Sequence, residues 1–93
     1  MDLDTLQHQI TPILKRHDVD RAGIFGSFSR GEQSEDSDLD ILIQFKGEKS
    51  LLDLAALKIE LEETLGIKVD LVTYRALSPR IRDKVLREQV AIL

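Results

Sequence analysis

Three aspartates and a glycine–serine pair are the residues whose types and spacing could do chemistry. Gly26 and Ser27 are followed by ten residues and then by Asp38 and Asp40, in the stretch GSFSRGEQSEDSDLD. Side chains two apart on a strand point the same way, so we expect these two carboxylates to share a face. At ~5 Å two such charges repel by about 3 kcal/mol at an effective dielectric constant near 20. A divalent cation would remove that repulsion, and oxygen ligands without His or Cys favour Mg²⁺ or Mn²⁺.

Asp70 is the candidate third ligand. It interrupts the apolar run KVDLVT between Val69 and Leu71, and a carboxylate in such a place needs a partner or a metal. If its strand lies beside the strand of Asp40, Asp70 can reach an ion held by the other two aspartates. Three carboxylates from adjacent strands are typical of a two-metal phosphoryl-transfer site.

The glycine–serine end of the motif suits phosphate. A short helix that starts after Gly26 would present backbone N–H groups and a positive dipole end to an anion. The glycine would let a phosphate approach the backbone, and the Ser27 hydroxyl would add a donor. Arg30, one turn later, could add a positive charge.

Each feature alone has a simpler explanation. Asp-x-Asp is common in solvated surface loops, Gly-Ser is common in turns, and Asp70 could be an edge-strand charge. The acidic stretch 32–40 also suggests a calcium loop, but the glycine and the closing glutamate of an EF-hand are missing. We favour the phosphate and metal interpretation because the three features occur together.

The hydrophobic pattern predicts one small sheet covered by helices, an α/β unit. Helices are expected at 4–16, 27–31, 50–65 and from Ser78-Pro79 onward, and strands at 21–25, 38–45 and 68–73, with a polar loop at 32–37; the final VAIL would form an edge strand or a frayed end. The consecutive Ile41, Leu42 and Ile43 predict a strand that is buried on both faces. The helix at 50–65 should have one apolar side and end at Gly66; that side is Leu51, Leu54, Leu57, Leu61 and Leu65.

The helix ends carry local signals as well. The hydroxyls of Ser27 and Ser78 would cap their helices, with Pro79 at the first position of the last one. Asp4 and Gln7 resemble a capping box for the first helix. Pro12 is expected to bend or shorten that helix.

Length and composition narrow the function classes. The 93 residues suit a single domain over 1–93, and no apolar run approaches the ~18 residues of a membrane span. The N-terminal sequence lacks a signal-peptide pattern, so we expect a cytoplasmic protein without a membrane anchor. The absence of cysteine excludes disulfides and thiolate-bound zinc. His8 and His17 lie outside the motif and are poor candidates for a metal site or a catalytic triad.

The pattern GSFSRG…SDLDILI, with KVDLVT one helix later, resembles the nucleotidyltransferases of the DNA polymerase beta-like superfamily. It is similar in particular to the minimal nucleotidyltransferases (MNT), the antitoxin partners of HEPN-domain toxins. The resemblance covers nearly the whole chain. It implies an α/β (α+β) fold, with a small mixed β-sheet flanked by helices as in the polymerase beta palm.

The resemblance also implies roles for the motif residues. Gly26 and Ser27 would hold the triphosphate of ATP, Asp38 and Asp40 would bind two Mg²⁺ ions, and Asp70 would ligate one metal and help to deprotonate the acceptor. The implied reaction transfers AMP from ATP to a side-chain hydroxyl, typically a tyrosine of the toxin, and releases pyrophosphate.

The expected sheet and helices use up these 93 residues, so we expect a partner protein or a second copy, as in a homodimer, to complete the site. Five basic residues of the last segment are either a solvated face or a docking surface for an acidic partner: Arg75, Arg80, Arg82, Lys84 and Arg87. Nucleic acid is an unlikely partner, because the net charge is -4 and interleaved aromatics are absent. Two other functions stay open: a non-catalytic antitoxin that acts by binding, and nucleotidyl transfer to a small molecule.

Overall fold

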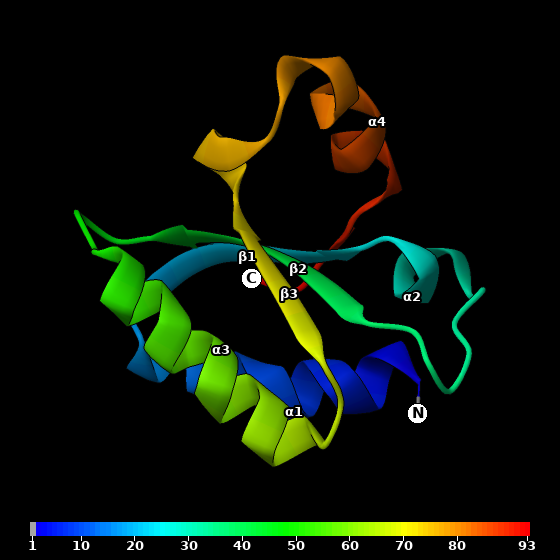
Figure 1. The fold of residues 1–93 in the computed structure, drawn as a ribbon, viewed down its shortest axis with the longest axis horizontal. Helices are drawn as coiled ribbons and strands as arrows, with labels where there is room; N and C mark the ends of the chain where they lie inside the picture. Colours follow the sequence, from blue (N-terminus) through cyan, green and yellow to red (C-terminus); the bar gives the residue numbers. More distant parts are fainter. Residues whose placement is uncertain (1) are drawn as a thin grey trace.

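The computed structural model describes residues 2–93 and has a four-stranded sheet with helices on both of its faces (Figure 1). The elements in chain order are α1 (Leu3–Arg16), β1 (Val19–Phe25), α2 (Ser27–Arg30), β2 (Leu39–Phe45), α3 (Leu51–Leu65), β3 (Val69–Thr73), the 3₁₀ helix η1 (Tyr74–Ala76), α4 (Pro79–Glu88) and β4 (Val90–Ala91). The predicted order of helices and strands is confirmed, and η1 is an addition to it.

The sheet is mixed, with the strand order β3-β2-β1-β4. β1 is antiparallel to both β2 and β4, whereas β2 and β3 are parallel and joined by the crossover helix α3. The last residues form a short edge strand, the first of the two predicted alternatives. After β4, the backbone N–H groups of Ile92 and Leu93 both donate to the carbonyl of Ala22, at 2.9 and 3.2 Å.

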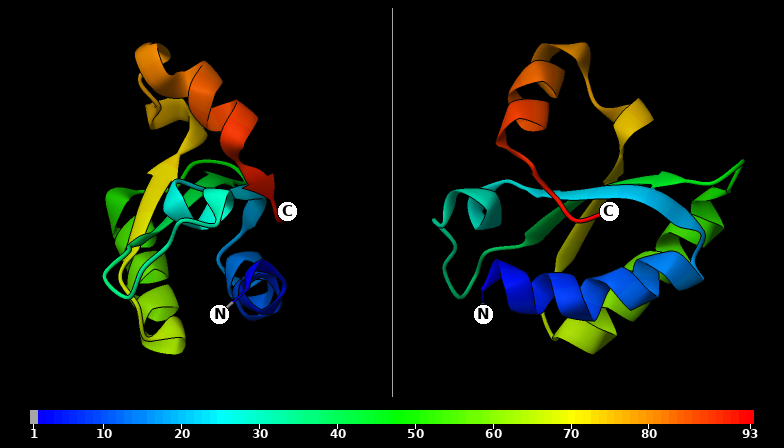
Figure 2. Two further views of the ribbon diagram at one scale, coloured as in Figure 1. Left: turned by 90° about the vertical axis from the view of Figure 1, so that its right-hand side faces the viewer. Right: turned by 180° about the vertical axis from the view of Figure 1, so that it is seen from behind.

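The main core lies between the sheet and the helices α1 and α3, which cover the same face (Figure 2). Ile41 and Ile43 point into this core, while Leu42 between them belongs to a cluster on the other face. All three are fully buried, as predicted for a strand covered on both sides. Burying a side chain of this size contributes about 1.5–3 kcal/mol, so these residues fix β2 as the centre of the fold.

The second face of the sheet is covered only in part, by α4 (Figure 1). Ser78 caps this helix by accepting a hydrogen bond from the Arg80 N–H, with Pro79 at the first position, as predicted. Val85 of α4 packs with Leu42 and Leu77 in a small cluster. Since strand residues two apart share a face, the residues two positions before Leu42 and Val72 lie beside this cluster. Those residues are Asp40 and Asp70.

The first helix differs from its prediction. It begins at Leu3, and the Asp2 side chain caps it by accepting a hydrogen bond from the Thr5 N–H, so the predicted capping box at Asp4 and Gln7 is wrong. The helix continues through Pro12 to Arg16 and is not shortened. The apolar face that packs on the sheet outweighs the one hydrogen bond lost at proline.

The helix α3 ends at the predicted stop, but one residue of its predicted apolar side is exposed. Ser50 and Asp53 form a capping box, and Gly66 ends the helix in the left-handed conformation. Leu51 was expected on the buried side but is 83% exposed, because the inward stripe starts one turn later at Leu54. No helix within residues 2–93 is long and apolar enough to cross a membrane.

Candidate active site

Asp40 and Asp70 face each other across neighbouring strands. The parallel register of β2 and β3 places them directly opposite one another. Burial raises the pKa of the Asp40 carboxyl to about 6, and the nearby charges of Asp70 and Asp38 and a hydrogen bond with the Asp70 side chain act in the same direction. As predicted, the third strand of the sequence brings Asp70 beside Asp40.

Asp38 lies at the edge of the site. The strand β2 begins at Leu39, one residue later than predicted, and leaves Asp38 exposed in front of it. Across residues 2–93, no three or more His, Cys, Asp or Glu side chains gather in an arrangement that would hold a metal. Like-charged carboxylates repel one another, so convergence of all three is expected only around a cation. The role of Asp38 as a metal ligand stays a prediction.

Gly26 lies against the carboxylate of Asp40. It has a φ of 72°, in the region that favours glycine, and it is the N-cap of α2. A Cβ atom placed on Gly26 would lie 2.1 Å from Oδ2 of Asp40. Phe25 pairs with Asp40 in the sheet, which explains why the next residue meets this side chain. The glycine–serine end of the motif therefore lies next to the carboxylate end.

The helix α2 is short and is anchored by its buried Phe28. Among residues 2–93 no side chain caps it by a hydrogen bond, and Ser27, half-buried, is its first residue. The Ser29 hydroxyl donates to the Gly26 carbonyl at 2.7 Å and ties this turn together. Ser27 lies at the start of the helix, but the prediction that its hydroxyl caps the helix is wrong, because Gly26 holds the N-cap position. The role of Ser27 in phosphate binding stays a prediction.

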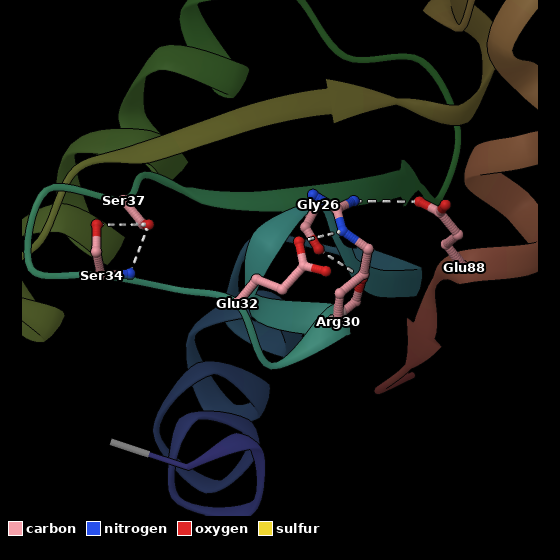
Figure 3. Close-up of polar contacts among 7 residues, drawn as sticks. Gly26, Arg30, Glu32, Ser34, Ser37 and Glu88 are labelled. Atoms are coloured by element: carbon pink, nitrogen blue, oxygen red, sulfur yellow. Dashed lines mark hydrogen bonds and ion pairs between the residues drawn. The ribbon is translucent and has the colours of Figure 1, made fainter.

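Arg30 is held by two carboxylates (Figure 3). Its Nε donates to the Glu32 carboxylate at 3.0 Å. Its Nη1 donates to the carboxylate of Glu88, in the last turn of α4, at 3.3 Å. These partners raise the pKa of Arg30, with Glu32 the larger influence. The charge of Arg30 also acts on Asp40, where it lowers the carboxyl pKa against the larger raising effects. Arg30 therefore lies close enough to the carboxylates to affect them.

Sequence reasoning missed Glu88. It is 58 residues from Arg30 in the chain, and no local pattern connects the two positions. The loop before β2 was predicted only as polar. Ser34 and Ser37 close it, with the Ser34 N–H donating to the Ser37 hydroxyl at 2.8 Å (Figure 3).

A hollow of about 570 Å³ lies elsewhere, at the far ends of β2 and β3, between Phe45, Lys49, Tyr74 and Arg75. It contains neither Asp40 nor Asp70, and we do not regard it as the reaction centre. The carboxylate pair offers oxygen donors for a hard cation. Gly26, the start of α2 and Arg30 offer space and positive potential for phosphate groups. Together they suit chemistry on a metal-bound polyphosphate.

Comparison with protein families agrees with this chemistry. Residues 8–93 match the family model described as "Polymerase beta, Nucleotidyltransferase". A protein of Methanocaldococcus jannaschii, named "Putative protein adenylyltransferase MJ0435", is 50% identical over 93 residues, which are 100% of both chains. "Protein adenylyltransferase MntA" of Thermococcus cleftensis is 46% identical over 78 residues, 84% of this chain and 79% of that protein.

Solved structures give the same result. One described as "Structure of putative minimal nucleotidyltransferase" has a TM-score of 0.84 and 47% identity, over 97% of this chain and 95% of that one. A toxin–antitoxin structure with AMP-PNP has a TM-score of 0.83 and 25% identity, over 94% and 72% of the two chains.

A complex of a tri-AMPylated HEPN toxin of Shewanella oneidensis with its MNT antitoxin has a TM-score of 0.76 over 97% and 71% of the two chains; at 21% identity it bears on the fold alone. The family match covers almost the whole chain, and its activity is the one that the carboxylate pair and the glycine turn suit. The chain belongs to the polymerase beta nucleotidyltransferase family, among its minimal nucleotidyltransferases.

Proposed function

We propose that this chain is a protein adenylyltransferase that acts as an antitoxin. It would transfer AMP from ATP to a tyrosine hydroxyl of a HEPN-domain toxin and release pyrophosphate. The observation that carries the proposal is the Asp40–Asp70 pair, placed in register on parallel strands with Gly26 against it. The names of the relatives support a protein as the acceptor.

The residues present fit a pair of Mg²⁺ ions, or Mn²⁺ in their place. The raised pKa of Asp40 reflects burial and the charges of two neighbouring carboxylates, a repulsion that a divalent cation relieves. Asp38, Asp40 and Asp70 would hold the ions. When bound, the ions would supply Lewis-acid activation of the acceptor hydroxyl and neutralise charge on the departing pyrophosphate.

The chain's own groups would bind and orient the nucleotide. Gly26 leaves space for a phosphate, and the start of α2 with the Ser27 hydroxyl offers hydrogen-bond donors. Arg30 would add positive charge at the β- and γ-phosphates. In the transfer, the acceptor oxygen forms a bond to the α-phosphorus as the bond to the pyrophosphate oxygen breaks. Asp70 would take the acceptor's proton.

A partner would complete the site. The sheet face that carries Asp40 and Asp70 is covered only in part by α4, so a macromolecule can approach it. A HEPN toxin is the proposed partner, because the motif of this chain resembles that of the MNT antitoxins and a structural neighbour at 25% identity is a toxin–antitoxin structure. A second copy of this chain is the alternative partner at that face.

The test is a labelling experiment. The protein is incubated with α-labelled ATP, Mg²⁺ and the protein encoded by the neighbouring gene, and label on that second protein is measured. We expect label with the wild type and none with the Asp38→Ala/Asp40→Ala variant. If neither protein gives label while the toxin is still neutralised, the chain is a binding antitoxin. Label on a small hydroxyl compound but not on protein would point to small-molecule transfer.

A further inference from the structure

The segment from η1 to α4 carries charge of opposite sign to the rest of the chain. Residues 74–89 hold five basic and two acidic side chains, which gives this segment a charge of +3. Since the net charge of the chain is -4, the remaining residues together carry a charge of -7. The acidic Glu88 is already paired with Arg30. None of the five basic side chains takes part in the ion pairs found across residues 2–93. This segment therefore presents unneutralised positive charge.

Three of these residues form a stripe along one side of α4. Arg80, Lys84 and Arg87 follow one another at steps of four and three, all are exposed, and the buried Val85 lies on a different side. We call these three residues the basic stripe. Arg82 lies apart from it, with its guanidinium donating to the Leu77 carbonyl at 3.3 Å.

The first two residues of the basic stripe work against the stability of their own helix, whereas Arg87 lies in the last turn, where positive charge is favoured. Arg80 and Lys84 are like charges four residues apart, which repel on a helix surface. Arg80 also lies in the first turn, where no acidic residue is present and where the helix dipole disfavours positive charge. A face that only had to be solvated would gain from glutamate at position 80 or 84. This cost suggests that the stripe has a binding role.

The helix that carries the stripe lies on the same side of the sheet as the candidate site. The helix α4 covers the sheet face that bears Asp40 and Asp70, opposite to α1 and α3 (Figure 2). A macromolecule that brings a hydroxyl to those carboxylates must approach next to α4. Charge on the outer side of this helix would meet the surface of that macromolecule before the acceptor enters the site.

An acidic protein surface fits the stripe better than a nucleic acid. The stripe spans seven residues of helix, or about 10 Å, so it matches a local acidic patch. An extended polyanion would also meet the remaining -7 charge of the chain. The helix α4 carries no aromatic side chain on which bases could stack.

We propose that the basic stripe of α4 is the docking surface for an acidic patch on the protein that accepts AMP. This inference rests on the proposed function in its choice of partner. It goes further by naming the surface that binds the partner and the charge of the patch that it contacts. Docking there would raise the association rate of the acceptor without touching the nucleotide.

The test compares two triple charge reversals. One is Arg80→Glu/Lys84→Glu/Arg87→Glu; the control is Lys15→Glu/Lys46→Glu/Lys58→Glu, which changes the net charge equally at exposed positions of other elements. The probe is the purified protein encoded by the neighbouring gene, which is the proposed acceptor. We expect the stripe variant to weaken binding of that protein at least ten-fold at 50 mM salt, with the KM for ATP within two-fold of wild type. The control should stay within about three-fold for both.

Several outcomes would overturn the inference. The inference fails if both variants weaken binding equally, or if the KM for ATP changes in the stripe variant alone. It also fails if a single-stranded RNA oligonucleotide binds the stripe more tightly than the protein probe does, or if the wild type is a homodimer that the stripe variant no longer forms. If the stripe variant unfolds, the Arg80→Ala/Lys84→Ala/Arg87→Ala variant takes its place. Binding is also measured with Asp40→Asn, which is expected not to transfer AMP. Stripe-dependent binding without transfer by the wild type would refute the proposed function and leave the docking surface standing.

Discussion

At the scale of single residues, the ionised form of Asp40 that would bind a metal opposes the folding of the metal-free protein. The pKa of Asp40 is raised from the ordinary value of 3.8 to about 6, so the native protein binds this proton more tightly than the unfolded chain does. The contribution of Asp40 to stability is therefore most favourable below pH ~4 and is lost as the pH rises towards 6. Near neutral pH the ionised carboxylate disfavours folding unless a cation is bound.

The first prediction follows from this conflict. Replacing Asp40 by asparagine removes the charge and should stabilise the metal-free protein at pH 7.5. A shift of two pKa units corresponds to ~3 kcal/mol, but the partial exposure of Asp40 reduces the expected gain to about 1 kcal/mol. Thermal unfolding in EDTA should show a Tm higher by roughly 4–8 °C at pH 7.5 and little difference near pH 4.

The control for this prediction is Asp36→Asn, which removes the same charge from an exposed loop position. It should leave the Tm within about 2 °C of wild type, since surface substitutions change stability little. A metal-free Asp40→Asn protein that is no more stable than wild type at pH 7.5 would show that the carboxylate repulsion is absent.

The second prediction concerns Gly26. Alanine here adds strain at a φ of 72° and places a methyl group 2.1 Å from Oδ2 of Asp40. Gly31 is the matched control, because its φ is 70° and a Cβ there meets nothing within 4 Å. Gly31 has a ψ of 21°, in the left-handed helical region, and alanine there should cost about 1 kcal/mol of stability. Gly26 has a ψ of -151°, in a region almost restricted to glycine, so its replacement should cost more, about 1–3 kcal/mol. Only Gly26→Ala should displace Asp40, so we expect AMP transfer to fall at least 100-fold, about 2.7 kcal/mol, in this variant alone.

The measurements are thermal unfolding and the rate of label transfer for both glycine variants. Similar rates for Gly26→Ala and Gly31→Ala would mean that the close approach to Asp40 is not required for the reaction. A large loss in both would point to general destabilisation of the motif.

At the scale of elements, local patterns predicted most of the fold. The cap Ser78 marks the start of α4 and the stop Gly66 marks the end of α3 as predicted, because capping is a local interaction. The strand β2 was recognised from its continuous apolar run. The capping box at Asp4 failed because an equally good cap, Asp2, stands two residues earlier.

What the sequence could not predict depends on residues that are far apart in the chain. The register that sets Asp40 against Asp70, the pairing of β1 with β4 and the contact of Arg30 with Glu88 are all of this kind. For the site, the residue types and the adjacency of β2 and β3 were predictable. The position of Asp38 outside the strand and the two partners of Arg30 were not.

The third prediction concerns the attachment of α4. Val85 is the one buried residue of this helix, whereas α3 buries Leu57, Leu61 and Leu65. Few buried contacts imply a low free energy of local opening. Hydrogen–deuterium exchange should therefore show α4 amides exchanging at least ten-fold faster than those of α3. Equal protection of the two helices would show that α4 opens only when the whole domain unfolds.

The contact of Arg30 with Glu88 gives this prediction a control. The pair joins the last turn of α4 to α2 at 3.3 Å with both side chains partly exposed, so Glu88→Gln should weaken it by less than about 1 kcal/mol. Exchange should become faster in α4 and stay unchanged in α3. If exchange accelerates equally in both helices, the contact stabilises the whole domain and not the attachment of α4.

At the scale of the whole molecule, a net charge of -4 and the carboxylate pair favour binding of a divalent cation. The two contributions can be separated. General screening acts on all exposed charges and depends on ionic strength, whereas binding at the site requires the aspartates themselves. A cation that binds the native state stabilises it by RT ln(1 + [L]/Kd), or about 1.4 kcal/mol at ten times the Kd.

The fourth prediction is that Mg²⁺ with a non-hydrolysable ATP analogue raises the Tm of the wild type by roughly 5 °C or more. NaCl at equal ionic strength should give less than half of this shift. The Asp70→Asn variant should lose most of the Mg²⁺ effect, because it removes one of the two paired carboxylates. An equal shift in wild type and Asp70→Asn would mean that the cation acts through general charge screening, and that the pairing of β2 with β3 does not build a metal site.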